Sequence, residues 1–174
     1  MKYLAAIALL TASPAAAEVV SVSPNGFEVR ETVSLVVPAD AAFASFTDVS
    51  AWWDPEHTYS GDSRNLSLAL APGGCFCERF PKTGGGIEHL RVTYVDPGKR
   101  VVFSGPLGPL LYEATAGVMD VQVKTAAGGS QLILTYRAAG FFKGGAEKLA
   151  PQVDEVLGVQ MKRLRTYAAG RPRT

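Results

Sequence analysis

The residues best suited to chemistry are Cys75 and Cys77, which are the only cysteines in the 174-residue chain. They lie one residue apart in the segment 73–80, GGCFCERF. A thiol can form a disulfide, ligate a metal or, as the thiolate, act as a nucleophile. His89 is the second candidate, because imidazole titrates near neutral pH and can serve as a general base or a polar anchor. The sequence contains no G-x-S-x-G, H-E-x-x-H or phosphate-loop motif.

Three interpretations of the cysteine pair need no metal. On a regular strand, Cys75 and Cys77 share one face with Cα atoms about 6.5 Å apart, so a disulfide would require a bulge or strain. Both can instead be small apolar residues on the concave wall of a pocket, which needs no special feature. In the third interpretation one cysteine is a reactive thiol, with a pKa lowered by His89 or Arg91 on the next strand.

A metal site would need further ligands beside the two thiols. His89 or His57 could supply an imidazole, and Glu78 or Glu88 a carboxylate. However, C-x-C is tighter than the usual spacing of zinc-binding cysteines, and Glu78 should point away from the thiols on a regular strand. We therefore predict neither a metal nor another cofactor.

The N-terminus has the features of a secretory signal peptide. Lys2 precedes the short apolar run 4–10, and Ala15-Ala16-Ala17 offers a cleavage site. This pattern predicts a signal peptide over residues 1–17, a mature domain over residues 18–174, and a periplasmic or secreted protein. The apolar run is shorter than the ~20 residues of a membrane span, so no transmembrane segment is expected in the mature chain.

Composition argues for one packed domain. The chain has 17 basic and 16 acidic residues, and Lys2 is the only charged residue within the predicted signal. A mature net charge near zero gives no electrostatic footprint for nucleic acid, so we expect no nucleic-acid partner. About 157 residues are enough to bury a core without a disulfide framework. The expected assembly is a monomer or a weak dimer.

The elements that must position these side chains follow from periodicity. Alternation over residues 26–37 predicts a half-buried strand whose apolar face is interrupted by Glu31. Residues 38–53 favour one or two short helices. From residue 65 to 141, short alternating segments separated by Gly and Pro clusters predict an antiparallel meander of about six strands. An apolar stripe over residues 150–168 predicts one long closing helix, with Pro151 in its first turn.

This order of elements resembles the START-like, or SRPBCC, helix-grip superfamily. The likeness is to the branch that holds activators of the heat-shock chaperone ATPase together with polyketide cyclase-like and uncharacterised proteins. It covers residues 26–167 and rests on these segments: VPADAAFASFTDVSAWW (37–53), VTYVDPGKRVVFSG (92–105), SQLILTYRAAGF (130–141) and the helix after Glu147. The resemblance implies an α+β fold in which a curved antiparallel sheet of about seven strands grips the last helix around an apolar cavity.

The function implied by the resemblance is ligand binding. We expect an exported protein that holds a small hydrophobic molecule, of lipid, polyketide or aromatic type, between the sheet and the last helix. A chaperone-activating role does not suit an exported chain. The residues expected to contact the ligand are Trp52, Trp53, Cys75, Cys77, His89, Phe103, Tyr136, Val153, Leu157 and Met161.

Two alternatives stay open. The first is a cyclase- or hydrolase-like enzyme that uses His89 with Cys75, Cys77 or a nearby carboxylate in the same cavity, and it requires His89 to point inward within reach of such a group. The second is an interaction module with a filled interior and an exposed apolar patch elsewhere.

Overall fold

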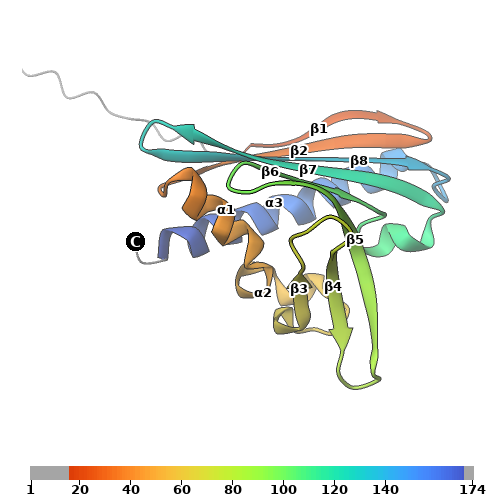
Figure 1. The fold of residues 1–174 in the computed structure, drawn as a ribbon. Coiled ribbons are helices and arrows are strands. Elements are labelled where there is room, and N and C mark those ends of the chain that lie inside the picture. The colour runs from red at the N-terminus through yellow and green to blue at the C-terminus, as the bar shows by residue number, and fades with distance from the viewer. Residues whose placement is uncertain (1–15, 171–174) are drawn as a thin grey trace, which may run out of the picture.

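One antiparallel sheet of eight strands organises residues 16–170, the part of the chain that the computed structural model describes (Figure 1). Its spatial order is β1-β2-β8-β7-β6-β5-β4-β3, so the first strands lie beside the last one. The strands are β1 (Ala16–Ser23), β2 (Gly26–Leu35), β3 (Leu66–Leu68), β4 (Cys75–Phe80), β5 (Gly85–Asp96), β6 (Arg100–Ser104), β7 (Thr115–Ala126) and β8 (Gly129–Gly140). The α+β class and the antiparallel meander are confirmed, and the sheet stays open at both edges.

The extra strand is β1. The sequence predicts about seven strands, whereas the described residues form eight. A register shift between Val19 and Ser21 breaks the alternation of β1, which hides the period of two that marks a strand. The predicted signal segment 1–17 lies outside the described residues except for Ala16 and Ala17, which open β1.

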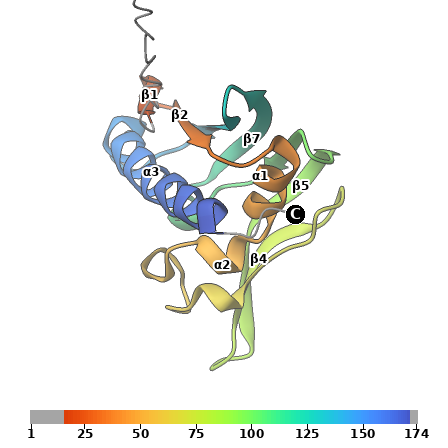
Figure 2. The same cartoon turned by 90° about the vertical axis from the view of Figure 1, so that its left-hand side faces the viewer.

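The long C-terminal helix α3 (Ala146–Gly170) lies along the concave side of the sheet (Figures 1 and 2). Leu157, Met161 and Leu164 are fully buried on its apolar stripe. The helix is confirmed but begins four residues earlier than the predicted residue 150, so Pro151 lies inside it and not in its first turn. Among residues 16–170, no helix has the length and apolar character needed to cross a membrane.

The short helices α1 (Ala39–Thr47) and α2 (Val49–Trp52) confirm the prediction for residues 38–53. Three 3-10 turns complete the fold: η1 (Pro55–His57), η2 (Ser63–Asn65) and η3 (Gly108–Tyr112). In Figure 2, the sheet and the α1–α2 segment enclose α3 from different sides.

The curvature of the sheet is concentrated around β5. Strands β3, β4 and β5 turn away from the layer formed by β1, β2, β8 and β7 (Figure 1). The β4–β5 pairing shifts register between Phe76 and Cys77, and the β5–β6 pairing shifts between Val92 and Tyr94. Such bulges bend a strand and increase its twist. They let the sheet fold around the helix.

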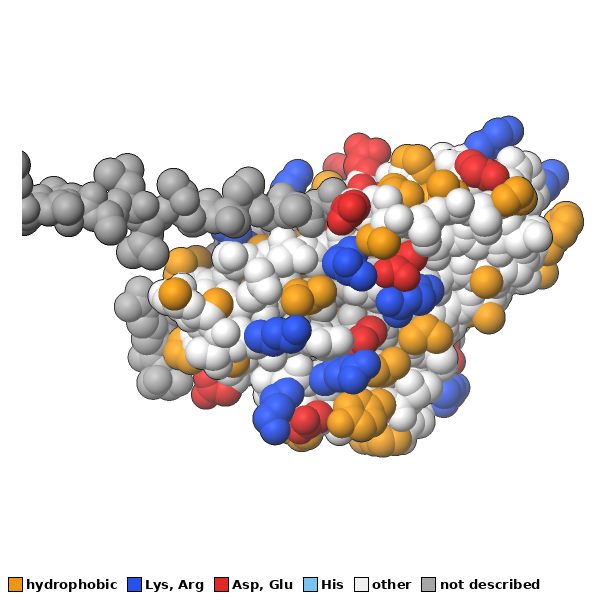
Figure 3. Space-filling model, turned by 90° about the horizontal axis from the view of Figure 1, so that it is seen from above, with side chains coloured by type: hydrophobic (Ala, Val, Ile, Leu, Met, Phe, Trp, Pro, Cys, Tyr) orange, Lys and Arg blue, Asp and Glu red, His pale blue; other side chains and the backbone are white. Residues whose placement is uncertain are grey.

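The outer face of the sheet carries charges of both signs interspersed with hydrophobic side chains (Figure 3). Glu28 pairs with Arg30 at 3.0 Å and with Arg137 at 2.7 Å. Arg100 and Asp120 form a further pair at 2.7 Å. These charges are therefore compensated by neighbours on the same strand or on an adjacent one.

Two carboxyl groups, one of them fully buried, face each other between the helix and the sheet. Glu31 of β2 is 1% exposed and faces Asp154 of α3. Both oxygens of Glu31 and Oδ1 of Asp154 are buried without a donor among residues 16–170, so the two groups fit together only when one carries a proton. Burial, followed by the charge of Asp154, raises the pKa of Glu31 to about 8, although Lys162 partly opposes this.

This pair should make stability depend on pH. An unfolded Glu31 loses its proton near pH 4.5, whereas the folded group keeps it up to about pH 8. The folded state binds the extra proton between these values, so the stability falls as pH rises through this window. The charged groups around the pair are Lys162 on α3 and Glu18 on β1.

We expect Glu31→Gln to raise the melting temperature at pH 8.5 by at least about 4 °C and to change it little at pH 4.5. Glutamine is isosteric, can donate to Asp154 and has no proton to lose. Glu28→Gln on the same strand is the matched control, and it should slightly lower the melting temperature at pH 8.5 because Glu28 is ion-paired on the outer face. Thermal unfolding of both variants across pH 4.5–8.5 checks this. Parallel profiles for wild type and Glu31→Gln would contradict it.

Candidate functional site

The candidate site is an apolar cavity of about 180 Å³ between the first half of α3 and the η3 turn. Strand β5 and the segment after α2 complete its wall. The residues that line it are Trp53, His57, His89, Leu107, Gly108, Pro109, Leu110, Leu149, Gln152, Val153, Val156 and Leu157. A larger groove of about 1010 Å³ crosses Pro38, Pro97 and Gly128, but it is shallow, open to solvent and lined by no histidine or aromatic residue. The smaller cavity, which is less open to solvent and carries aromatic and imidazole side chains, is therefore the better candidate.

Four of the ten residues expected to contact a ligand lie in this wall: Trp53, His89, Val153 and Leu157. They come from three separate parts of the chain, and the helix supplies two of them. The remaining wall comes largely from the η3 region, which has no periodic pattern and was not expected to contribute.

Four of the other expected residues fill the interior. Phe103 and Met161 are buried core residues at 2% and 0% exposure. Trp52 is also buried, and its indole Nε1–H donates to the Phe46 carbonyl at 3.2 Å. Tyr136 is fully buried. These bulky side chains pack the hollow between sheet and helix and leave only the end next to η3 open.

Tyr136 supports the cavity from a distance. Its hydroxyl donates to the Gly105 carbonyl at 3.1 Å and accepts from the Leu107 N–H at 2.9 Å. Burial raises the pKa of Tyr136 to about 12, so the hydroxyl keeps its proton at neutral pH. This contact fixes the chain that leads into η3, and thus positions Leu107 and Leu110 in the cavity wall.

A β-bulge turns His89 inward. Phe76 pairs with Leu90 and Cys77 pairs with Glu88, so His89 is an extra residue on β5 with no partner on β4. As a result, His89 and Leu90 are both buried, which a regular alternation would not allow. The sequence pattern suggests that His89 and Arg91 share a face, but the bulge places Arg91 on the outer one.

Glu78 holds the imidazole of His89. The side chain of His89 is 6% exposed and that of Glu78 is 0% exposed. Nε2 of His89 lies 3.1 Å from Oε2 of Glu78. The carboxylate also accepts from the backbone N–H groups of Tyr59 at 3.1 Å and Ser60 at 2.5 Å. Glu78 points away from the cysteines, as expected, and this direction carries it toward His89.

The pKa values of this pair define its charge state. Burial alone would raise the pKa of Glu78, but hydrogen bonds from Ser60, Tyr59 and His89 outweigh burial and hold the pKa below its usual range. Burial lowers the pKa of His89, and the hydrogen bond and charge of Glu78 offset this only in part. At neutral pH the pair is therefore a carboxylate beside a neutral imidazole.

This charge state fixes the tautomer of His89. Because ionised Glu78 can only accept, Nε2 of His89 must carry the ring proton and donate it. Nδ1 is then a bare acceptor, and it is buried without a partner among residues 16–170. The arrangement gives the cavity wall a carboxylate-oriented imidazole with an unused lone pair, which can accept a hydrogen bond or take up a proton.

His57 differs from His89 in the ring nitrogen that is hydrogen-bonded, which is Nδ1 in His57 and Nε2 in His89. The Asp54 N–H donates to Oε1 of Gln160 at 2.9 Å, so the amide nitrogen of Gln160 faces Nδ1 of His57, at 2.7 Å. Nδ1 of His57 therefore accepts this hydrogen bond. Gln160 is fully buried and fixes both partners. His57 is exposed and forms part of the outer wall.

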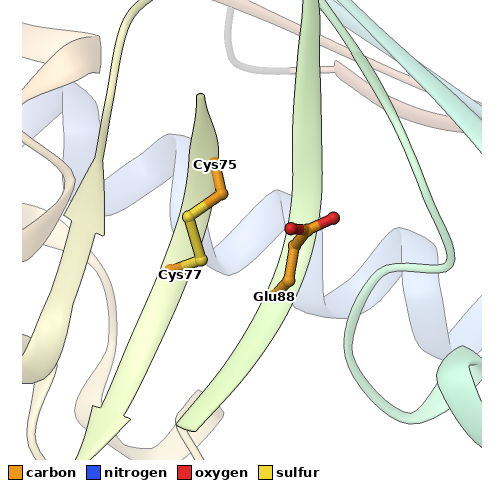
Figure 4. A group of neighbouring side chains, drawn as sticks. All are labelled: Cys75, Cys77 and Glu88. Atoms are coloured by element: carbon orange, nitrogen blue, oxygen red, sulfur yellow. A yellow bond between two sulfur atoms is a disulfide. The ribbon is translucent and has the colours of Figure 1, made fainter. Parts of the chain in front are cut away.

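Cys75 and Cys77 form a disulfide on the other face of the sheet (Figure 4). They pair with Arg91 and Glu88, both exposed, whereas Phe76 between them is buried. The expectation that both cysteines line the concave wall is therefore not met. Their Cα atoms lie 5.4 Å apart, which is closer than in a regular strand and within the range that a disulfide can bridge.

Glu88 lies beside the disulfide on β5 (Figure 4). One ligand-type atom from each of Cys75, Cys77 and Glu88 falls within 4.8 Å of the others. In the oxidised pair neither sulfur is a thiolate, and Glu88 is ion-paired with Arg91. The group is therefore a disulfide that lies beside the Glu88–Arg91 ion pair. Neither cysteine can act as the nucleophile of the cavity.

Comparison with known proteins supports the fold. No family model matches the chain, and no curated protein matches it. Among solved structures, an uncharacterised protein from Rhizobium leguminosarum superposes with a TM-score of 0.62 at 15% identity, covering 90% of this chain and 98% of that one. A protein from Chromobacterium violaceum gives 0.57 at 15% identity, covering 86% and 100%. One from Rhizobium loti gives 0.53 at 23% identity, covering 82% and 99%. These likenesses are compatible with a helix-grip fold.

The disulfide should contribute little to the stability of the fold. Its cysteines are only two positions apart, and closing so short a loop stabilises a protein by roughly 1.5 kcal/mol. We expect the double variant Cys75→Ser/Cys77→Ser to melt about 3–6 °C below wild type. Thiol titration of unreduced, denatured wild type should find no free thiol. Two free thiols would contradict the disulfide. A decrease in melting temperature of more than about 10 °C in the double variant would contradict its minor contribution to stability.

Proposed function

We propose that this protein is an exported START-like domain that binds a small aromatic molecule in the cavity beside α3. The observation that carries the proposal is the partly open apolar cavity lined by Trp53, Leu110, Val153 and Leu157 next to two oriented imidazoles. Small-molecule sites are typically concave and apolar, with a few placed polar groups. The cavity has this composition.

The size of the cavity narrows the ligand class. A cavity of about 150 Å³ in another protein binds benzene, and the present one is about 180 Å³. It therefore suits one ring with one or two substituents. A long acyl chain or a multi-ring polyketide exceeds this volume, so of the three ligand types considered from the sequence, the aromatic type is favoured.

The disulfide supports export. Disulfides persist in oxidising compartments and are rare in the reducing cytosol. The pair Cys75–Cys77 is therefore consistent with the periplasmic or secreted location that the predicted signal over residues 1–17 suggests.

Calorimetric titration with toluene tests the proposal. A seven-atom apolar ligand in such a cavity should bind with a dissociation constant on the order of 0.1–1 mM, whereas palmitate should not compete with it. Val156→Trp places an indole in the wall and should weaken toluene binding at least about tenfold. Glu155→Trp, on the exposed side of the same helix, should leave it unchanged. If folded wild type binds neither toluene nor a polar single-ring compound such as phenol, the proposal is overturned.

The Glu78–His89 hydrogen bond favours a second candidate function. A carboxylate-oriented imidazole with a free Nδ1 is the arrangement of a general base, as the cyclase- or hydrolase-like alternative requires. The cysteines are excluded from such a mechanism by their position, so His89 would act on water or on a proton of the substrate.

Phenyl acetate hydrolysis tests this candidate. If His89 activates water, the rate should fall by at least about tenfold in His89→Phe and in Glu78→Gln, since general bases contribute a hundredfold or more. The rate in Glu155→Trp should equal that of wild type. Equal rates in all four folded proteins would show that the cavity binds without turnover.

A further inference from the structure

We infer that the ligand of this cavity is a neutral hydroxyl-bearing ring of the phenol class, which donates its O–H to Nδ1 of His89. This inference rests on the proposed function, since it names the chemistry of the molecule that the cavity holds. It goes further because it assigns the ligand a polar group, a polarity and a partner atom.

The first step is the unused lone pair. His89 lines the cavity, and its Nδ1 is buried without a hydrogen-bond partner among residues 16–170. A buried polar atom without a partner is costly, and such atoms usually bond to protein, water or ligand. The side chains that surround the imidazole ring, Phe76 and Tyr59, contact it through their rings, at centroid distances of 5.0 and 5.9 Å. A group inside the cavity is the remaining candidate, and because Nδ1 is itself almost fully covered, such a group reaches it through a small shift of the imidazole ring or of the wall.

The second step is the polarity of the missing group. Nε2 of His89 donates to Glu78, so Nδ1 can only accept, and its partner has to donate. An ether, ester or ketone offers no donor. A hydroxyl or an N–H group does.

The third step is the charge of the ligand. The residues that line the cavity include no Lys, Arg, Asp or Glu, and apart from His57, His89 and Gln152 the wall is apolar, so no ion pair in it compensates an ionised ligand. A carboxylate would in addition be repelled by the nearby negative charge of Glu78 and would face a lone pair. A neutral hydroxyl meets both conditions, and on a single ring it fits about 180 Å³.

Three ligands of nearly equal size test the inference: phenol, toluene and anisole. In a purely apolar cavity, toluene binds more tightly than phenol, because the hydroxyl loses its water. With Nδ1 as acceptor, wild-type protein should bind phenol at least as tightly as toluene and about tenfold more tightly than anisole, in which a methyl group replaces the donated proton. Calorimetric titration at pH 8, where His89 is neutral, gives all three constants.

Variants and a spectroscopic measurement assign the effect to His89. His89→Phe keeps a ring in place but removes the acceptor, so toluene should bind about tenfold more tightly than phenol. Val156→Trp should weaken all three ligands alike. In wild type, phenol but not toluene should shift the ¹⁵N resonance of Nδ1 of His89.

The outcomes separate the inference from the proposed function. If toluene binds wild type but phenol binds at least tenfold more weakly, with no change at Nδ1, the phenol class is overturned and the aromatic site stands. If none of the three ligands binds, both the proposed function and this inference are wrong. If His89→Phe does not fold, the comparison of the three ligands on wild type decides the question.

Discussion

The site depends on one extra residue in β5. His89 has no partner on β4, so β5 forms a bulge at this position. The alternation of inward and outward side chains along β5 is interrupted there. The bulge places His89 inside, where buried Glu78 can hold it at 3.1 Å, and it sends Glu88 and Arg91 outward to flank the disulfide. A regular β5 would expose either His89 or Leu90. The oriented imidazole and the outward direction of Glu88 and Arg91 therefore share one local cause, which also contributes to the bend of the sheet.

Much of the fold could be predicted from the sequence because its signals are local. Alternation over 26–37, turn clusters from residue 65 onward and the helical stripe after residue 150 each report the period of one element. The failures occur where a local irregularity breaks the period. β1 was missed because a register shift follows Val19, and α3 begins at Ala146, ahead of the residue suggested by Pro151.

The site was harder to predict because it depends on strand phase and long-range packing. His89, Trp53, Val153 and Leu157 do lie in the cavity wall, but the cysteines fall on the opposite face, and the η3 wall carries no pattern. A spacing of two residues shows that Cys75 and Cys77 share a face but not which face it is. The available signal was Phe76: a large apolar residue between two cysteines indicates that its own side of the strand is the buried one.

Large buried side chains and buried hydrogen bonds together explain why the cavity beside α3 is small and confined to one end. Tyr136, Met161 and Phe103 fill most of the hollow that a bent sheet leaves above a straight helix. At the η3 end, hydrogen bonds fix three of the lining residues: Tyr136 holds the backbone of Leu107, Gln160 holds His57, and Glu78 holds His89. Side chains fixed in this way cannot collapse into the gap without breaking a buried hydrogen bond, which costs about 1–3 kcal/mol each. These hydrogen-bonded groups therefore resist closing of the cavity at this end, and among residues 16–170 a buried side-chain atom without a partner remains there, Nδ1 of His89.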